Sequence, residues 1–274
     1  MEKIEYPKKL QQVVGVDTDG QVYKNIDELW QKEVDVNATE NKDNKWYKSA
    51  DDYWKTVTPT VDGMLGGLSH VSSADTIASK FFIKDFIQGT PTRPAISLDR
   101  ALDCGAGIGR VTKDFLLPLG FKNVDLVEQN ELFLNEAKSK FFKDDKRVEN
   151  YYAVGLQDWK AEHKYDCIWI QWVIGHLHDT DFIEFLKRCV DSLAPNGVIC
   201  IKDNVAKGSF IMDKEDNSVT RNEAHLKFLF EKSGCKLIKA LVQPNFPKEL
   251  FPVIMFALEK KEDQKVEQQE EKKE

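Results

Sequence analysis

The 274-residue sequence predicts an α/β fold in which a largely parallel sheet carries helices on both faces. After the breaker Thr90–Pro94, short apolar segments alternate with segments of helical periodicity, as in consecutive βα units. The last two apolar segments lack a helix between them, so they should pair as antiparallel strands. No apolar run is long enough to cross a membrane.

Alternating apolar patterns and breakers place the elements in order. The expected strands are Arg100–Cys104, Val124–Glu128, Glu149–Val154, Cys167–Trp172, Val198–Lys202, Leu237–Val242 and Val253–Leu258. The expected helices are Val111–Leu117, Leu132–Phe142, Phe182–Leu193 and Asn222–Lys232. The third helix should stop at Ala194–Gly197, which reads as a turn. Before these units, Ser72 or Ser73 can cap a helix whose Ile77, Phe81, Phe82 and Phe86 face one side.

The chain divides into an N-terminal extension of unknown role (residues 1–44), a main domain (45–258) and a charged tail (259–274) that we expect to be disordered. In the extension, Asp17–Gly20 predicts a turn between two strands, and its glycine spacing does not fit a calcium loop. Ile26, Trp30 and Val34 recur at helical spacing, which favours a packed stripe.

Composition excludes several classes of function. The net charge of -7 argues against a nucleic-acid binder that relies on phosphate contacts. The first residues lack the apolar core of a signal peptide, and five cysteines without a CxxC pair favour neither a disulfide framework nor a structural zinc site. We therefore expect a protein of the cytoplasm or nucleus that binds no membrane, no nucleic acid and no metal.

A glycine-rich turn follows the first predicted strand of the alternating region. It reads Asp103-Cys104-Gly105-Ala106-Gly107-Ile108-Gly109-Arg110, and its glycines let the backbone approach a ligand at the carboxyl edge of the sheet. Arg110 stands where a dinucleotide fingerprint has its third glycine, so the spacing favours S-adenosylmethionine over NAD. Glu128 ends the next strand, where a carboxylate can accept hydrogen bonds from both ribose hydroxyls of the cofactor. Arg110 is either a solvated helix-start residue or a partner for the cofactor's carboxylate.

Four blocks of sequence resemble the eukaryotic α-N-terminal protein methyltransferases, which methylate the free amine of proteins beginning Xaa-Pro-Lys or Xaa-Pro-Arg. The similarity covers about residues 46–258, and its blocks are Tyr53–Gly67 (YWKTVTPTVDGMLGG), Ala101–Arg110 (ALDCGAGIGR), Ile168–His176 (IWIQWVIGH) and Pro195–Asn204 (PNGVICIKDN). The resemblance implies the Rossmann-like, seven-stranded sheet of class I methyltransferases, with an N-terminal helical lid segment. Separately, we expect a monomer, although the sequence leaves the oligomeric state open.

The resemblance also implies a set of cofactor residues for S-adenosylmethionine and its product S-adenosylhomocysteine. They are Gly105, Gly107, Arg110, Glu128, Gln129, Asn130, Leu156, Gln157 and Gln171. Most relatives have aspartate in place of Glu128 and a less polar pair in place of Gln129 and Asn130.

On the substrate side, the resemblance implies Trp54, Leu65, Gly66, Trp172, Asp203, Asp213 and Ser218, with Asp216, His176 and Asn204 as catalytic residues. Trp172 would stack on the substrate proline and attract the forming ammonium. Asn204 would hold the first peptide group, Asp213 would attract the basic third residue, and Leu65 and Gly66 would belong to the lid.

The chemistry of the substrate fits a weak base. An α-amino group has a pKa of about 8, roughly 2.5 units below that of lysine, so a nearby carboxylate or imidazole can free its lone pair. Asp216 or His176 would do so. Without the resemblance, His176 would read as a structural histidine, Asp216 as a loop acid or helix cap, and Trp172, like Cys104 and Cys167, as a core residue.

Three other functions stay open from the sequence. The chain could be a methyltransferase for a small molecule or a lysine side chain, a non-catalytic Rossmann-like scaffold that acts through its extension or tail, or a dehydrogenase. The presence of both Arg110 and Glu128 argues against the scaffold, because an idle fold needs neither. Whether NADH or S-adenosylmethionine raises the melting temperature would distinguish a dehydrogenase from a methyltransferase.

Overall fold

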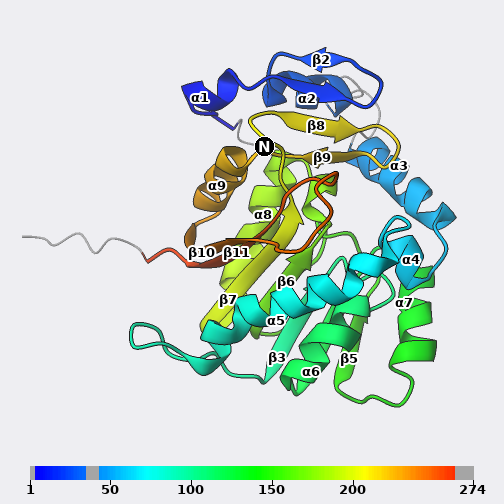
Figure 1. Cartoon of the computed structure of the whole chain (residues 1–274), viewed down its shortest axis with the longest axis vertical. Coiled ribbons are helices and arrows are strands. Elements are labelled where there is room, and N and C mark those ends of the chain that lie inside the picture. The colour runs from blue at the N-terminus through cyan, green and yellow to red at the C-terminus, as the bar shows by residue number, and fades with distance from the viewer. Residues whose placement is uncertain (1–3, 35–42, 263–274) are drawn as a thin grey trace, which may run out of the picture.

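The computed structural model describes residues 4–34 and 43–262 of the chain, with side chains described in the second range from Lys45 onward. Its centre is a seven-stranded sheet of order β10-β11-β7-β6-β3-β4-β5 (Figure 1). The strands are β3 (Arg100–Cys104), β4 (Asn123–Val127), β5 (Val148–Tyr152), β6 (Tyr165–Gln171), β7 (Leu193–Asn204), β10 (Cys235–Val242) and β11 (Val253–Lys260). Neighbours from β7 to β5 are parallel, and β11 is antiparallel to both of its neighbours, so the predicted topology is confirmed.

The sheet is buried on both faces because successive side chains of its strands point in opposite directions. In β3, Leu102 joins one hydrophobic cluster with α8 (Asp179–Asp191) and α9 (Glu223–Lys232), while Ala101 joins another with α5 (Ser72–Gln88). The second cluster also includes residues of the π-helical turn Thr112–Leu116, which continues into α6 (Leu117–Leu119), and of α7 (Glu131–Glu136). The prediction of helices on both faces is confirmed.

Three local predictions were wrong. The helix α5 begins at Ser72 after Val71, and neither Ser72 nor Ser73 caps it. Ile77 and Phe81 are each 66% exposed, because the buried side of α5 runs through Ala78, Phe82 and Phe86. The segment Ala194–Gly197 belongs to β7 instead of a turn that precedes it. A register shift between β6 and β7, together with a left-handed Asn196 (φ 62°), absorbs the breaker residues inside the strand.

The N-terminal extension forms structure of its own at one end of the sheet (Figure 1). It contains α1 (Lys8–Gln11), the hairpin of β1 (Gly15–Asp17) and β2 (Val22–Tyr23), and α2 (Ile26–Glu33). The predicted turn is confirmed: the Asp17 carboxylate accepts the N–H groups of Asp19 and Gln21. Ile26, Trp30 and Val34 are buried in the larger hydrophobic cluster, as their spacing predicts.

A second, four-stranded sheet joins this extension to the main domain. Its order is β2-β1-β8-β9, where β8 (Phe210–Asp213) and β9 (Ser218–Thr220) form a hairpin after β7. Between the extension and α5 lie α3 (Asp43–Thr56) and α4 (Val61–Met64). The second sheet thus sets residues 213–218 at the end of the molecule that the extension covers.

The C-terminal charged segment is partly built into the sheet. β11 ends at Lys260, so the first two residues of the charged segment belong to the sheet, whereas residues 263–274 of the expected disordered tail lie outside the described residues. Among the described residues, none of the helices combines the length and apolar composition that a bilayer-spanning helix needs.

Candidate active site

The glycine-rich turn after β3 is largely buried and adopts a left-handed backbone at its glycines. Gly105 and Gly107 have left-handed φ angles of 68° and 54°, a region that favours glycine. A Cβ at Gly105 would lie 2.6 Å from the side chain of Val173, and one at Gly107 would lie 2.7 Å from the sulfur of Met64. Side chains at these two positions would therefore strain the turn and fill the space in front of it.

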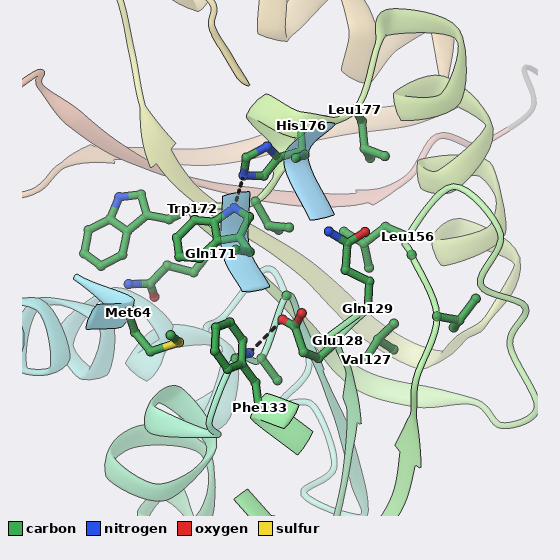
Figure 2. A pocket seen from close by; sticks show the side chains of 18 of the residues that line it. Met64, Val127, Glu128, Gln129, Phe133, Leu156, Gln171, Trp172, His176 and Leu177 are labelled. Carbon is green, nitrogen blue, oxygen red and sulfur yellow. Dashed lines mark hydrogen bonds between the residues drawn. The ribbon is translucent and has the colours of Figure 1, made fainter. Parts of the chain in front are cut away.

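Glu128 closes the same turn from the end of β4. Its carboxylate accepts the N–H of Gly107 at 3.0 Å (Figure 2). It also accepts the N–H of Asn130 at 2.9 Å. Burial raises the pKa of Glu128, and the two backbone donors oppose that rise. The acid is thus fixed in a low-dielectric wall with room for further hydrogen bonds at its two oxygens.

Arg110 begins the helical segment after the turn and is buried. Its Nη1 donates to the Asp75 carboxylate at 2.8 Å and to the Ser72 hydroxyl at 3.4 Å, both on α5. Gln171, at the end of β6, donates to the other oxygen of Asp75 at 2.9 Å. Sequence reasoning missed Asp75, although an acid on the otherwise apolar side of a predicted helix was a signal for it.

The turn, Glu128 and Arg110 line one cavity of about 940 Å³, part of it open solvent. Eight of the nine cofactor residues expected from the sequence line it: Gly105, Gly107, Arg110, Glu128, Gln129, Leu156, Gln157 and Gln171. Figure 2 shows Met64 and Trp172 on one side of this space and Gln129 and Leu156 on the other. Asn130 is not in the lining: its side chain accepts the N–H of Leu132 as the cap of α7 and donates to the Trp54 carbonyl.

A second cavity of about 970 Å³ adjoins the first. The substrate-side residues expected from the sequence that line it are Trp54, Leu65, Trp172, His176, Asp203, Asn204, Asp216 and Ser218. Gly66 and Asp213 do not line it. Gly66 is exposed in the turn after α4. Asp213 ends β8, and its carboxylate accepts a hydrogen bond from the N–H of Glu215. Sequence reasoning missed Phe246, Leu250 and Phe251, which add an apolar wall from the loop between β10 and β11.

Four side chains line both cavities: Trp54, Met64, Trp172 and His176. Trp172 has a left-handed φ of 52°, a strained value for a bulky residue, directly after β6. The guanidinium of Arg110 lies 5.7 Å from its ring centre, and Phe246 packs 6.3 Å away, centroid to centroid. A ligand in one cavity therefore meets a ligand in the other at this aromatic boundary.

Asp203 fixes the turn that carries Trp172. One carboxylate oxygen accepts the N–H groups of Val173 at 3.2 Å and Ile174 at 3.3 Å, and the other accepts the N–H of Asn204 at 2.8 Å. Burial raises the pKa of Asp203 to about 7 despite these donors. The carboxylate is occupied by backbone groups, so it positions the cavity wall.

The imidazole of His176 has both ring nitrogens engaged. Nε2 accepts the indole N–H of Trp54 at 3.1 Å, and Nδ1 lies 3.3 Å from the carbonyl oxygen of Asn217. An indole only donates and a carbonyl only accepts, so the proton resides on Nδ1 and the ring is neutral. In this arrangement the lone pair of His176 is bound to Trp54.

Asp216 lies in the loop between β8 and β9 and carries an unsatisfied oxygen. Its Oδ1 is buried and has no hydrogen-bond partner in the described part of the chain. Burial raises the pKa of Asp216, and hydrogen bonding from Ser218 opposes that rise. A buried acceptor without a partner is costly, which indicates that a donor from a ligand belongs there.

The side chains that could bind a metal ion do not gather at this site. Across residues 4–34 and 43–262, no group of three or more histidine, cysteine, aspartate or glutamate side chains is placed to hold a metal ion. All five cysteines are buried, and burial raises the pKa of Cys104, so its thiol is a core group as expected.

Comparison with known proteins places the chain among methyltransferases. A family model described as AdoMet dependent proline di-methyltransferase matches residues 42–259. An alpha N-terminal protein methyltransferase 1 of Dictyostelium discoideum is 70% identical over 260 residues, which are 94% of this chain and 95% of the relative. The N-terminal Xaa-Pro-Lys N-methyltransferase 1 of Homo sapiens is 48% identical over 79% of this chain and 96% of its own length.

A solved structure agrees with the sequence relatives. A SAM-dependent methyltransferase of Leishmania major superimposes with a TM-score of 0.81 and 37% identity, over 94% of this chain and all of that chain. The seven-stranded mixed sheet is accordingly that of class I methyltransferases, and S-adenosylmethionine is the cofactor of the matching family.

Proposed function

The chain belongs to the AdoMet dependent proline di-methyltransferase family, and we propose that it methylates the α-amino group of proteins whose N-terminus begins Xaa-Pro-Lys or Xaa-Pro-Arg. One observation carries this proposal. Two cavities meet at Trp54, Met64, Trp172 and His176, and the buried, unpartnered oxygen of Asp216 lies in the wall of the second. That arrangement suits a small cationic head group that enters from one side to meet a cofactor on the other.

The first cavity fits S-adenosylmethionine group by group. Glu128 offers carboxylate oxygens to the ribose hydroxyls. Arg110 can pair with the methionine carboxylate, because its two contacts to α5 both use Nη1 and a guanidinium has five N–H donors. Leu156 and Phe133 supply apolar lining for the adenine, with Gln129 and Gln157 as polar neighbours.

The second cavity fits the start of a peptide. Trp172 offers a ring face to the proline and to the cationic amine, and Asn204 offers its amide to the first peptide group. Leu65 and Trp54 cover the chain, with Gly66 in the lid turn, and Ser218 supplies a hydroxyl. Asp213 and Glu215 place negative charge at the loop outside the cavity, where a basic third residue would lie.

The residues of this chain contribute positioning and one proton acceptor. The cofactor, when bound, supplies an electrophilic methyl group on its sulfonium. Asp216 accepts a proton from the substrate ammonium and leaves the amine lone pair free for in-line attack. His176, held neutral by Trp54 and Asn217, keeps that wall of the cavity in place. Most of the rate enhancement then comes from the fixed geometry of the two cavities.

A single chain lines both cavities, so we infer that a monomer suffices for activity. Gel filtration of the active protein at assay concentration tests this inference, and activity confined to a dimer fraction contradicts it.

Mass spectrometry tests the proposed reaction. A hexapeptide beginning Ser-Pro-Lys is incubated with the protein and S-adenosylmethionine beside its N-acetylated twin. We expect gains of one to three methyl groups on the free peptide and none on the acetylated one, because acetylation turns the amine into an amide whose lone pair is delocalised into the carbonyl and no longer nucleophilic. Equal labelling of both peptides would indicate lysine side-chain methylation, and no labelling while the cofactor binds would point to another acceptor.

A further inference from the structure

Residues 4–34 of the N-terminal extension lie outside the family model, which begins at residue 42. The human relative matches 79% of this chain while 96% of its own length is covered, so it has no counterpart for about a fifth of the chain. In Figure 1 the extension, in dark blue, lies beside β8, β9 and α3. These elements carry the peptide side of the site.

Strand pairing joins the extension to the loop that carries Asp216. β1 pairs in parallel with β8, with Gly15 opposite Phe210 and Asp17 opposite Met212. Beyond the ladder, the N–H of Thr18 donates to the Met212 carbonyl at 3.0 Å. The hairpin β8-β9 would be a two-stranded ribbon without β1, and an isolated hairpin is marginally stable in water.

Side chains of the extension also hold the loop itself. The hydroxyl of Thr18 accepts the backbone N–H of Lys214 at 3.0 Å, and the Lys214 ammonium pairs with Glu33 at 3.2 Å and with Asp17 at 4.0 Å. Lys214 lies between Asp213 and Glu215. The two acids of the extension thus draw the loop's cation away from the carboxylates that face a basic substrate.

A buried network ties the extension to the turn that carries His176. The hydroxyl of Tyr6 donates to the Asp179 carboxylate at 2.7 Å, and Arg221 donates to the same carboxylate at 2.8 Å. Arg221 directly follows β9 and also donates to the carbonyls of Ile174 and Leu177, on either side of His176. One guanidinium therefore connects the hairpin, the His176 turn and, through Asp179, the extension.

Helix α2 adds a third connection. Trp30 packs edge-on against Trp46 of α3, with ring centres 5.4 Å apart, and the indole N–H of Trp46 donates to the His176 carbonyl at 2.6 Å. The amide of Asn217 in turn donates to the Trp46 carbonyl at 3.3 Å. Strand pairing ends at the Asp216 loop, which lines only the second cavity, whereas the buried network and this aromatic pair end at His176, which lines both cavities.

We propose that residues 4–34 are a positioning element for the peptide substrate, which acts through the strand pairing that holds the Asp216 loop, a loop that lines the second cavity and not the first. The proposal rests on the proposed function for its choice of substrate. It predicts that loosening the extension weakens peptide binding and leaves the affinity for S-adenosylmethionine unchanged.

The test uses the full-length chain and a substitution in β1. A Cβ at Gly15 would lie 2.1 Å from the fully buried ring of Phe210, so Gly15→Val should force β1 away from β8. Val16→Thr is the matched control, because Val16 is the exposed residue of the same strand. A milder variant, Thr18→Val, removes only the acceptor of the Lys214 N–H.

Three quantities are measured for each variant: amide hydrogen exchange of residues 210–220 without ligand, the Kd of S-adenosylmethionine, and the Kd of a Ser-Pro-Lys peptide with S-adenosylhomocysteine bound. For Gly15→Val we expect faster exchange in the hairpin, a peptide Kd raised about tenfold or more, and a cofactor Kd within about threefold of wild type. Thr18→Val should change exchange and peptide Kd in the same direction by less, and Val16→Thr should match wild type.

Three results would overturn the proposal. They are a loosened hairpin with an unchanged peptide Kd, a peptide Kd and a cofactor Kd that rise together, and a hairpin whose exchange does not respond to Gly15→Val. A wild-type chain that does not bind the peptide overturns the proposed function instead. The hairpin exchange, measured without any ligand, still reports separately whether the extension holds the loop.

Discussion

The indole nitrogen of Trp54 lies 3.1 Å from Nε2 of His176 and donates a hydrogen bond to it. Trp54 comes from α3, which precedes the sheet, whereas His176 follows β6 by a few residues. The bond therefore joins the N-terminal covering helix to the carboxyl edge of the sheet. It also occupies the one ring lone pair of the neutral imidazole that could accept a proton. Of the two candidate bases, His176 is therefore engaged, whereas Asp216 has an oxygen without a partner among the described residues.

His176→Gln should lower kcat by less than about tenfold while raising the KM for peptide, because the side chain positions the cavity wall and does not take the proton. Glutamine retains one acceptor for the Trp54 indole. Steady-state kinetics with a Ser-Pro-Lys peptide measure both constants. A loss of kcat as large as that of an Asp216 variant, at unchanged KM, would return His176 to the role of base.

Asp216→Asn should lower kcat by about 100-fold or more, since general-base contributions are typically of that size. Asparagine has the same shape but cannot accept the proton. The Kd of S-adenosylmethionine, measured by calorimetry, should stay within about threefold of wild type, because Asp216 lines only the second cavity. A wild-type rate in this variant removes Asp216 from the mechanism.

The cofactor half of the site could be predicted because its signals are local in sequence. Gly105, Gly107 and Arg110 form one turn, and Glu128 ends the next strand, so the parallel order of β3 and β4 brings them together. The strand β3 has the predicted bounds, and each other strand of the seven-stranded sheet overlaps its prediction, whereas β8 and β9 of the second sheet were not predicted.

The contacts that Asp75 and Phe246 make depend on tertiary packing, which local patterns do not specify. Asp75 meets Arg110 and Gln171 only when α5 lies across the sheet, and the same packing exposes Ile77 and Phe81. Phe246 reaches Trp172 from a loop far along the chain. Helical spacing alone identified α5 but not which of two adjacent apolar stripes would be buried.

Trp172→Ala should weaken peptide binding by about tenfold or more and cofactor binding by less, because the indole forms the boundary wall and packs against Phe246 on the peptide side. Calorimetry with each ligand separates the two effects. Trp172→Phe keeps an aromatic face and should restore part of the peptide affinity. A larger loss for the cofactor than for the peptide would assign Trp172 to the first cavity.

Gly107→Ala should weaken cofactor binding by about tenfold or more, as measured by calorimetry. The substitution forces an alanine into a left-handed backbone and puts its Cβ 2.7 Å from the Met64 sulfur, at the edge of the cofactor cavity. Gly208→Ala is the control, since Gly208 is also left-handed (φ 75°) but a Cβ there would have nothing within 4 Å. Equal cofactor affinities in the two variants would contradict the prediction, because the contact at Gly107 would then have no effect on the cavity.

The pH dependence of stability should carry the signature of Asp203. Its pKa of about 7 in the folded chain lies above the ordinary value of about 4, so the folded state binds the extra proton between these values. Stability from this group is therefore full below about pH 4 and is lost as the pH rises to about 7, by at most about 4 kcal/mol. In the Asp203→Asn variant, the free energy of unfolding should therefore change less with pH between about pH 4 and about pH 7 than it does in the wild type.

Chemical denaturation of wild type and variant at several pH values between about 4 and 8 measures this difference. Asp85→Asn is the control: a hydrogen bond from Lys239 lowers the pKa of Asp85, so any stability that this group contributes is present above about pH 4 and is lost only below it. The Asp85 variant should keep the wild-type slope. If the Asp203 variant keeps it too, the carboxylate is ionised throughout the window, and the three N–H donors from Val173, Ile174 and Asn204 outweigh its burial.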